Sequence, residues 1–60
     1  MRKFKTLLKD SGYSQSVLEE ADMYGLRDEV IEAAYDKWKE GAELEDAIRD
    51  AAYDFEIELL

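Results

Sequence analysis

The acidic residues of this chain are spaced in a way that could serve a chemical function. Two rows step along the sequence four residues at a time, Asp28, Glu32, Asp36, Glu40 and then Asp46, Asp50, Asp54, Glu58. Residues four apart lie on one face of an α-helix, about 6 Å apart along its axis, and like charges so placed destabilise it by roughly 0.2–0.5 kcal/mol per pair. The rows therefore predict a negative surface presented to a positively charged partner.

A solvated face that keeps a small protein soluble is the alternative interpretation of both rows. The electrostatic interpretation requires an outward stripe that the chain's own lysines and arginines do not neutralise. Tyr24 and Tyr13, each beside a glycine, are expected to be exposed. Tyr35 and Trp38 are expected in the core, although a Trp or Tyr at the rim of an acidic face is also a usual anchor of a protein interface. The predicted partner-binding residues are Asp28, Glu32, Asp36, Asp46, Asp50, Asp54 and Tyr24.

Few residues of the chain could support catalysis or metal binding, because it contains no histidine and no cysteine. Ser11, Ser14 and Ser16 suit turns and helix caps better than catalysis, and neither a glycine-rich phosphate loop nor an EF-hand loop is present. We therefore expect no enzyme activity, no catalytic residues, no metal ligands and no cofactor.

Charge narrows the choice of partner. The net charge is −8 and the pI about 4.3, so nucleic acid and anionic membranes should repel the chain. A basic protein surface, such as that of a nucleic-acid-binding protein, is the expected partner. Residues 1–10 carry four bases and one acid, whereas residues 11–60 carry fifteen acids and four bases. The basic head is expected to dock on the acidic body or to lie solvated.

Sixty residues without cysteine predict a single domain, residues 1–60, held together by helix packing. Proline is absent, and Gly12, Gly25 and Gly41 fall where helical patterns stop, as left-handed residues after a helix would. Apolar spacing between them predicts an all-α bundle of three or four short helices, at about residues 2–10, 15–24, 27–40 and 43–56. No apolar run is long enough for a membrane span, and a cytoplasmic location is expected.

Two helix boundaries are less clear in the sequence. The second helix is expected to begin with the capping box Ser16-Val17-Leu18-Glu19, with Ser14 as an earlier cap. At the other end, residues 53–59 alternate between apolar and acidic side chains, which would also suit a strand paired with residues 2–8. Segment 53–60 is thus helix or strand, and the pattern alone does not decide.

An internal similarity links the third and fourth segments. Placing residues 26–42 over residues 44–60 aligns Ala33 with Ala51, Ala34 with Ala52 and seven other identical or similar pairs. Eighteen residues are five helical turns, but Gly41 favours two helices over one. Either a duplication or the common composition of two amphipathic helices explains the similarity.

Residues 17–36 resemble the helix-turn-helix motif. Ala21 lies in the first helix, Gly25 in the turn with Leu26 after it, and Ile31 and Ala34 at inward positions of the second helix. The resemblance implies a helix-turn-helix-like centre. DNA reading does not follow, because a recognition helix presents Arg, Lys, Asn, Gln or Ser to the major groove and the matching helix here presents acids.

In size, acidity and lack of catalytic residues the chain is similar to short accessory proteins of bacteriophages, including inhibitors of host restriction or CRISPR machinery that occupy nucleic-acid sites. That likeness implies an inhibitor whose carboxylates imitate phosphates in the cytoplasm of a bacterial host. The first alternative is a self-associating helical module, a homodimer formed through Leu44, Ile48 and Phe55. The second is a helix-turn-helix transcriptional regulator.

Overall fold

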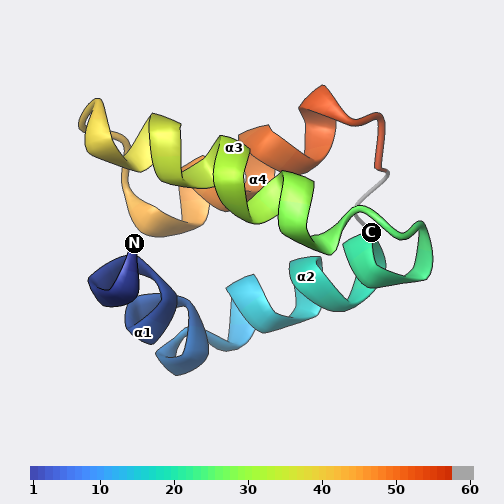
Figure 1. Cartoon of the computed structure of the whole chain (residues 1–60), viewed down its shortest axis with the longest axis horizontal. Helices are drawn as coiled ribbons and strands as arrows, with labels where there is room; N and C mark the ends of the chain where they lie inside the picture. The colour runs from blue at the N-terminus through green and yellow to red at the C-terminus, as the bar shows by residue number, and fades with distance from the viewer. Residues whose placement is uncertain (58–60) are drawn as a thin grey trace.

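Four helices make up most of the molecule. The computed structural model describes residues 1–57, which form α1 (Arg2–Asp10), α2 (Gly12–Met23), α3 (Arg27–Lys39) and α4 (Leu44–Asp54) and contain no strand. In Figure 1, α1 and α2 form the lower half of the bundle, and α3 and α4 lie side by side above them. The predicted all-α class is confirmed, and residues 1–57 form four helices where the sequence predicts three or four.

The junction between α1 and α2 differs from the prediction. Ser11 is extended, with φ −101° and ψ 110°, and its hydroxyl accepts a hydrogen bond from the backbone N–H of Ser14 at 3.2 Å. Ser11 is therefore the N-cap of α2, and Gly12 is the first residue of that helix. The predicted start at residue 15, the Ser16 capping box and the helix-ending role of Gly12 are wrong, because an earlier serine already caps the helix.

Gly25 and Gly41 end helices in the predicted manner. Both have positive φ angles, 70° and 112°. After Gly25, the backbone N–H of Leu26 donates to the carbonyl of Ala21 at 2.9 Å, and after Gly41 the N–H of Ala42 donates to that of Lys37 at 3.2 Å. These are Schellman motifs, in which a left-handed residue turns the chain so that the last carbonyls of a helix find donors.

Helix α4 ends in the same motif without a glycine. Glu56 has φ 60°, and the N–H of Ile57 donates to the carbonyl of Ala52 at 3.0 Å. The left-handed turn brings the Ile57 side chain back into the core, where only 2% of it is exposed. The predicted helix end at residue 56 is thus two residues too long, and the strand over 53–59 is wrong for residues 53–57. Residues 58–60 lie outside the described residues.

The core is built mainly of small and medium apolar side chains from all four helices. Helices α3 and α4 make the most extensive contact. The aligned alanines Ala34 and Ala52 and the aligned pair Val30 and Ile48 are all fully buried, so the internal similarity places matching residues of both helices in the core. The buried apolar residues are Phe4, Leu8, Val17, Leu18, Ala21, Val30, Ile31, Ala34, Ala47, Ile48, Ala51, Ala52 and Ile57.

Aromatic contacts attach the basic helix α1 to the body. The fully buried Phe4 ring lies 5.4 Å from the Tyr35 ring and 5.2 Å from the Trp38 ring, centroid to centroid, in tilted arrangements that aromatic pairs prefer. Tyr35 and Trp38 are half-buried and pack against the core, as expected. The basic head thus docks through its apolar side, and its four cationic side chains remain exposed.

Candidate acidic binding surface

The acidic row of α3 is open to solvent along its whole length. Asp28, Glu32, Asp36 and Glu40 are all exposed, and within residues 1–57 none of these carboxylates has a lysine or arginine nitrogen within 4 Å. Three steps of four residues extend over about 18 Å of helix. We call these four residues the α3 acidic row, and it meets the predicted condition of an outward, unneutralised stripe.

The acidic row of α4 does not meet that condition. Arg49 lies between two of its aspartates, with Nη2 3.1 Å from Oδ1 of Asp46 and Nε 3.6 Å from Oδ1 of Asp50. Lys37 reaches across from α3 and places Nζ 3.0 Å from Oδ2 of Asp54. The expectation of free carboxylates is therefore wrong for Asp46, Asp50 and Asp54, because cations one to three residues away and on the neighbouring helix reach them. Glu58, the last member of the row, lies outside the described residues.

Lys37 marks the border between the two rows. Its pKa is raised above the ordinary lysine value, first by the hydrogen bond to Asp54 and then, against some desolvation, by the charges of Asp54, Asp50 and Glu40. A raised pKa means that the folded chain holds this proton more tightly than a free lysine would. Lys37 therefore stays charged at neutral pH and neutralises the α4 side of the surface.

Tyr24 is exposed, as predicted, with 61% of its surface accessible. It caps the C-terminus of α2 beside Gly25, and its neighbour Met23 is the most exposed large apolar residue within residues 1–57, at 79%. Tyr13, the other tyrosine expected at the surface, is 41% exposed. The turn between α2 and α3 therefore presents two adjacent apolar side chains just before the α3 acidic row begins.

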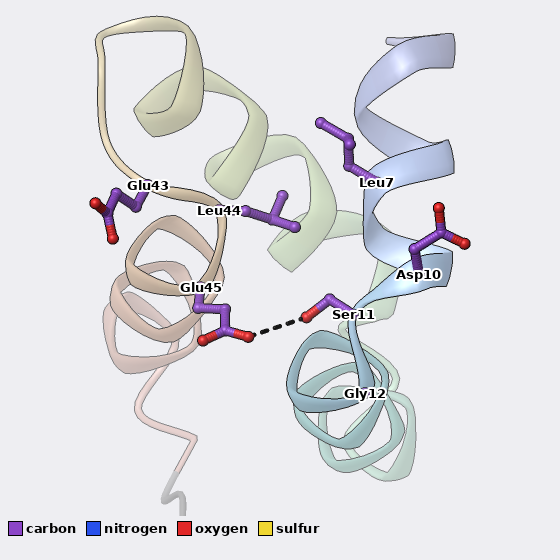
Figure 2. Close-up of a pocket in the computed structure, with 7 residues that line it drawn as sticks. All are labelled: Leu7, Asp10, Ser11, Gly12, Glu43, Leu44 and Glu45. Carbon is purple, nitrogen blue, oxygen red and sulfur yellow. Dashed lines mark hydrogen bonds between the residues drawn. The ribbon is translucent and has the colours of Figure 1, made fainter.

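Sequence patterns missed a further acidic feature, a shallow groove between the α1–α2 junction and the start of α4. In Figure 2, Leu7 and Leu44 face each other, Glu43 and Asp10 point outward on opposite sides, and the Ser11 hydroxyl donates to Oε2 of Glu45 at 3.4 Å. We call it the acidic groove, and its lining residues are Leu7, Asp10, Ser11, Gly12, Glu43, Leu44 and Glu45. They come from helix ends and a loop, where helical periodicity carries no signal.

The residues predicted for self-association and for DNA binding lie in positions that suit those functions less well. Ile48 is fully buried, and Leu44 and Phe55 pack against the core from its edge, so the face named for self-association is largely used within the chain. A three-residue turn does join α2 to α3, but the exposed side of α3 is the acidic row, with Arg27 as the exposed cation at its start. Such a helix would be repelled by DNA phosphates.

Residues 1–57 contain no group of three or more acidic, histidine or cysteine side chains arranged to hold a metal ion. None of the four helices combines the length and apolar character needed to cross a bilayer. Comparisons of the chain with family models, with curated proteins and with solved structures find no match.

Proposed function

We propose that this chain is a non-catalytic binding module that offers the α3 acidic row to a basic surface of another protein. The observation that carries the proposal is the difference between the two rows. Arg49 and Lys37 neutralise carboxylates of α4, whereas those of α3 face solvent without an ion pair in the described part of the chain. Unpaired like charges at four-residue spacing disfavour a helix, so a partner that uses them explains their retention better than stability does.

Flanking features suit the same kind of partner. Tyr24 offers an exposed aromatic ring near the start of the row, and tyrosine is among the residues that most often dominate interface energies. The acidic groove could take a lysine or arginine from the partner, with the aliphatic stem on Leu7 and Leu44 and the charged head beside the Glu45 carboxylate.

The finer part of the proposal concerns what the partner normally binds. A basic surface complementary to a row of carboxylates is also complementary to phosphates, so occupation of that surface would exclude nucleic acid. On this proposal the chain acts as an inhibitor in the cytoplasm of a bacterial host, as its similarity in type to phage accessory proteins implies. Its helices take no catalytic part.

Two charge-matched variants test the proposal. The α3 variant carries Asp28→Asn, Glu32→Gln and Asp36→Asn, and the control carries Asp46→Asn, Asp50→Asn and Asp54→Asn. A partner is first isolated from a bacterial lysate and purified, and its affinity for each variant is then measured. We expect the α3 variant to lose about tenfold or more in affinity and the α4 control to lose much less, although both remove three negative charges.

Salt and competition complete the experiment. Affinity for the wild-type chain should fall steeply between about 50 mM and 500 mM NaCl, because screening weakens attraction between exposed charges. A duplex or single-stranded oligonucleotide should compete with the chain for the partner. A flat salt dependence, or equal losses in the two variants, would show that the α3 acidic row is only a solvated face.

A further inference from the structure

A hollow where α1, α2 and α3 meet has an unexpected lining for a chain with a net charge of −8. Lys5 and Lys9 of α1 and Arg27, the first residue of α3, stand around it. The buried side chains of Leu8, Leu18 and Ile31, each less than one-tenth exposed, form its bottom. We call this feature the cationic hollow.

The cations of the hollow differ from those in the C-terminal half of the chain. Lys37 and Arg49 are ion-paired, and Lys39 lies 4.8 Å from the centre of the Tyr35 ring. By contrast, Lys5, Lys9 and Arg27 make no ion pair within 4 Å in residues 1–57, although Asp28 lines the same hollow. Cations gathered without a partner repel one another, and an anion seated among them would remove that repulsion.

Size and shape indicate what kind of anion fits. The hollow is partly open to solvent and has a volume of about 150 Å³, similar to that of a closed, engineered apolar cavity that holds one benzene molecule. Its apolar bottom suits a ring, and its rim suits an oxyanion. Gln15 ties the site together, because its Nε2 donates to the backbone carbonyl of Leu8 at 3.0 Å and so fixes α2 against the end of α1.

We propose that the cationic hollow binds a small aromatic oxyanion, a carboxylate or phosphate attached to a single ring. The ring lies on Leu8, Leu18 and Ile31, and the oxyanion accepts hydrogen bonds from the lysines and Arg27. This site differs from the proposed function in its ligand, because it takes a small anion while the α3 acidic row takes a basic protein, although Asp28 borders both. Either one can fail without the other.

Titration of the isotope-labelled chain tests the site directly. Phenyl phosphate and benzoate are the probes, and benzyl alcohol, which has the ring without the charge, is the control. We expect dissociation constants of about 1 mM for the two anions, with the largest amide shifts near Lys9, Gln15 and Arg27. Benzyl alcohol should bind about tenfold more weakly or not at all, because it lacks the charge-assisted hydrogen bonds.

Charge-matched variants separate the site from general attraction. Lys9→Gln with Arg27→Gln removes two cations of the hollow, and Arg2→Gln with Lys3→Gln removes two exposed cations outside it. The first pair should weaken phenyl phosphate binding about tenfold and the second less than about twofold. Circular dichroism checks that both variants fold. No localised shifts at about 10 mM probe, equal binding of benzyl alcohol, or equal weakening by the two pairs would overturn the proposal.

Discussion

Ser11 is both the C-cap of α1 and the N-cap of α2, so we expect its side chain to contribute more to stability than that of Ser16. Its hydroxyl accepts from the Ser14 N–H, and loss of an N-cap oxygen destabilises a protein by about 1 kcal/mol. We expect Ser11→Ala to lower the free energy of unfolding by about that amount in urea denaturation. Ser16→Ala is the control, because Ser16 is exposed inside α2 and caps nothing. A larger loss from Ser16→Ala would instead support the capping box that the sequence suggested.

Glu56 occupies a backbone position that favours glycine. At φ 60° a side chain with Cβ is disfavoured by about 1–2 kcal/mol, and a negative charge just after a helix C-terminus adds a small unfavourable term. Glu56→Gly should therefore raise the free energy of unfolding by about 1 kcal/mol, even though glycine gains entropy in the unfolded chain. For a domain of this size that is a rise of roughly 4–8 °C in the melting temperature.

The matched control for this prediction is Glu56→Ala, which removes the charge but keeps Cβ. Glu56→Ala should raise the free energy of unfolding only by the small electrostatic contribution. If alanine stabilises the chain as much as glycine does, the left-handed conformation of residue 56 is not the source of the effect.

At the scale of elements, the Lys37–Asp54 ion pair joins α3 to α4. Its contribution to the stability of the fold should decrease at high pH. The folded-state pKa of Lys37 is raised, chiefly by the Asp54 hydrogen bond, so the stabilisation is complete below the ordinary lysine value of 10.5. It is lost as the pH rises through the folded pKa, because the folded chain must then release a proton that it holds tightly. Wild type should thus exceed Lys37→Gln in stability at pH 7–9, and the difference should shrink above pH 10.5.

Denaturant titrations at several pH values measure that difference, and an Asp54→Asn background provides the control. Without the aspartate, the effect of Lys37→Gln should lose most of its pH dependence. A difference between wild type and Lys37→Gln that persists unchanged to high pH would show that Lys37 stabilises the helices through its aliphatic stem and not through its charge.

The helices themselves were the most predictable elements. Apolar spacing in α3 and α4 is long and regular, and Gly25 and Gly41 supply the left-handed turns that end α2 and α3. The sequence predicts too late a start for α2 because two overlapping serine patterns compete, and the local pattern cannot tell which serine lies next to a helix end. It does not predict the end of α4, because a glutamate takes a glycine position there, held by the burial of Ile57.

The candidate site was predictable only where one helix makes all of it. Four-residue spacing is enough to place the α3 acidic row on one face. The ion pair between Lys37 and Asp54 depends on how two helices pack, and the acidic groove and the cationic hollow each depend on three helices. Such features follow from tertiary contacts that a single sequence does not display.

At the scale of the whole molecule, positive charge is concentrated on α1 and negative charge on the rest. Helix α1 is held mainly by Phe4 and Leu8, with its cations exposed, while Asp28 and Glu32 lie near Lys5 without pairing within 4 Å in residues 1–57. The electrostatic attraction between α1 and the acidic remainder of the chain therefore acts between separated charges and not through ion pairs. It offsets only part of the repulsion among sixteen acidic residues.

That balance predicts that salt stabilises the fold. Raising NaCl from about 10 mM to 500 mM should raise the melting temperature by roughly 3–8 °C, because screening relieves net repulsion and the exposed ion pairs contribute little. The α3 variant with three neutralised acids should show a smaller rise. A melting temperature that falls with salt would mean that internal ion pairs outweigh the repulsion. Because salt should strengthen the fold and weaken the proposed complex, loss of binding at high salt cannot be attributed to unfolding.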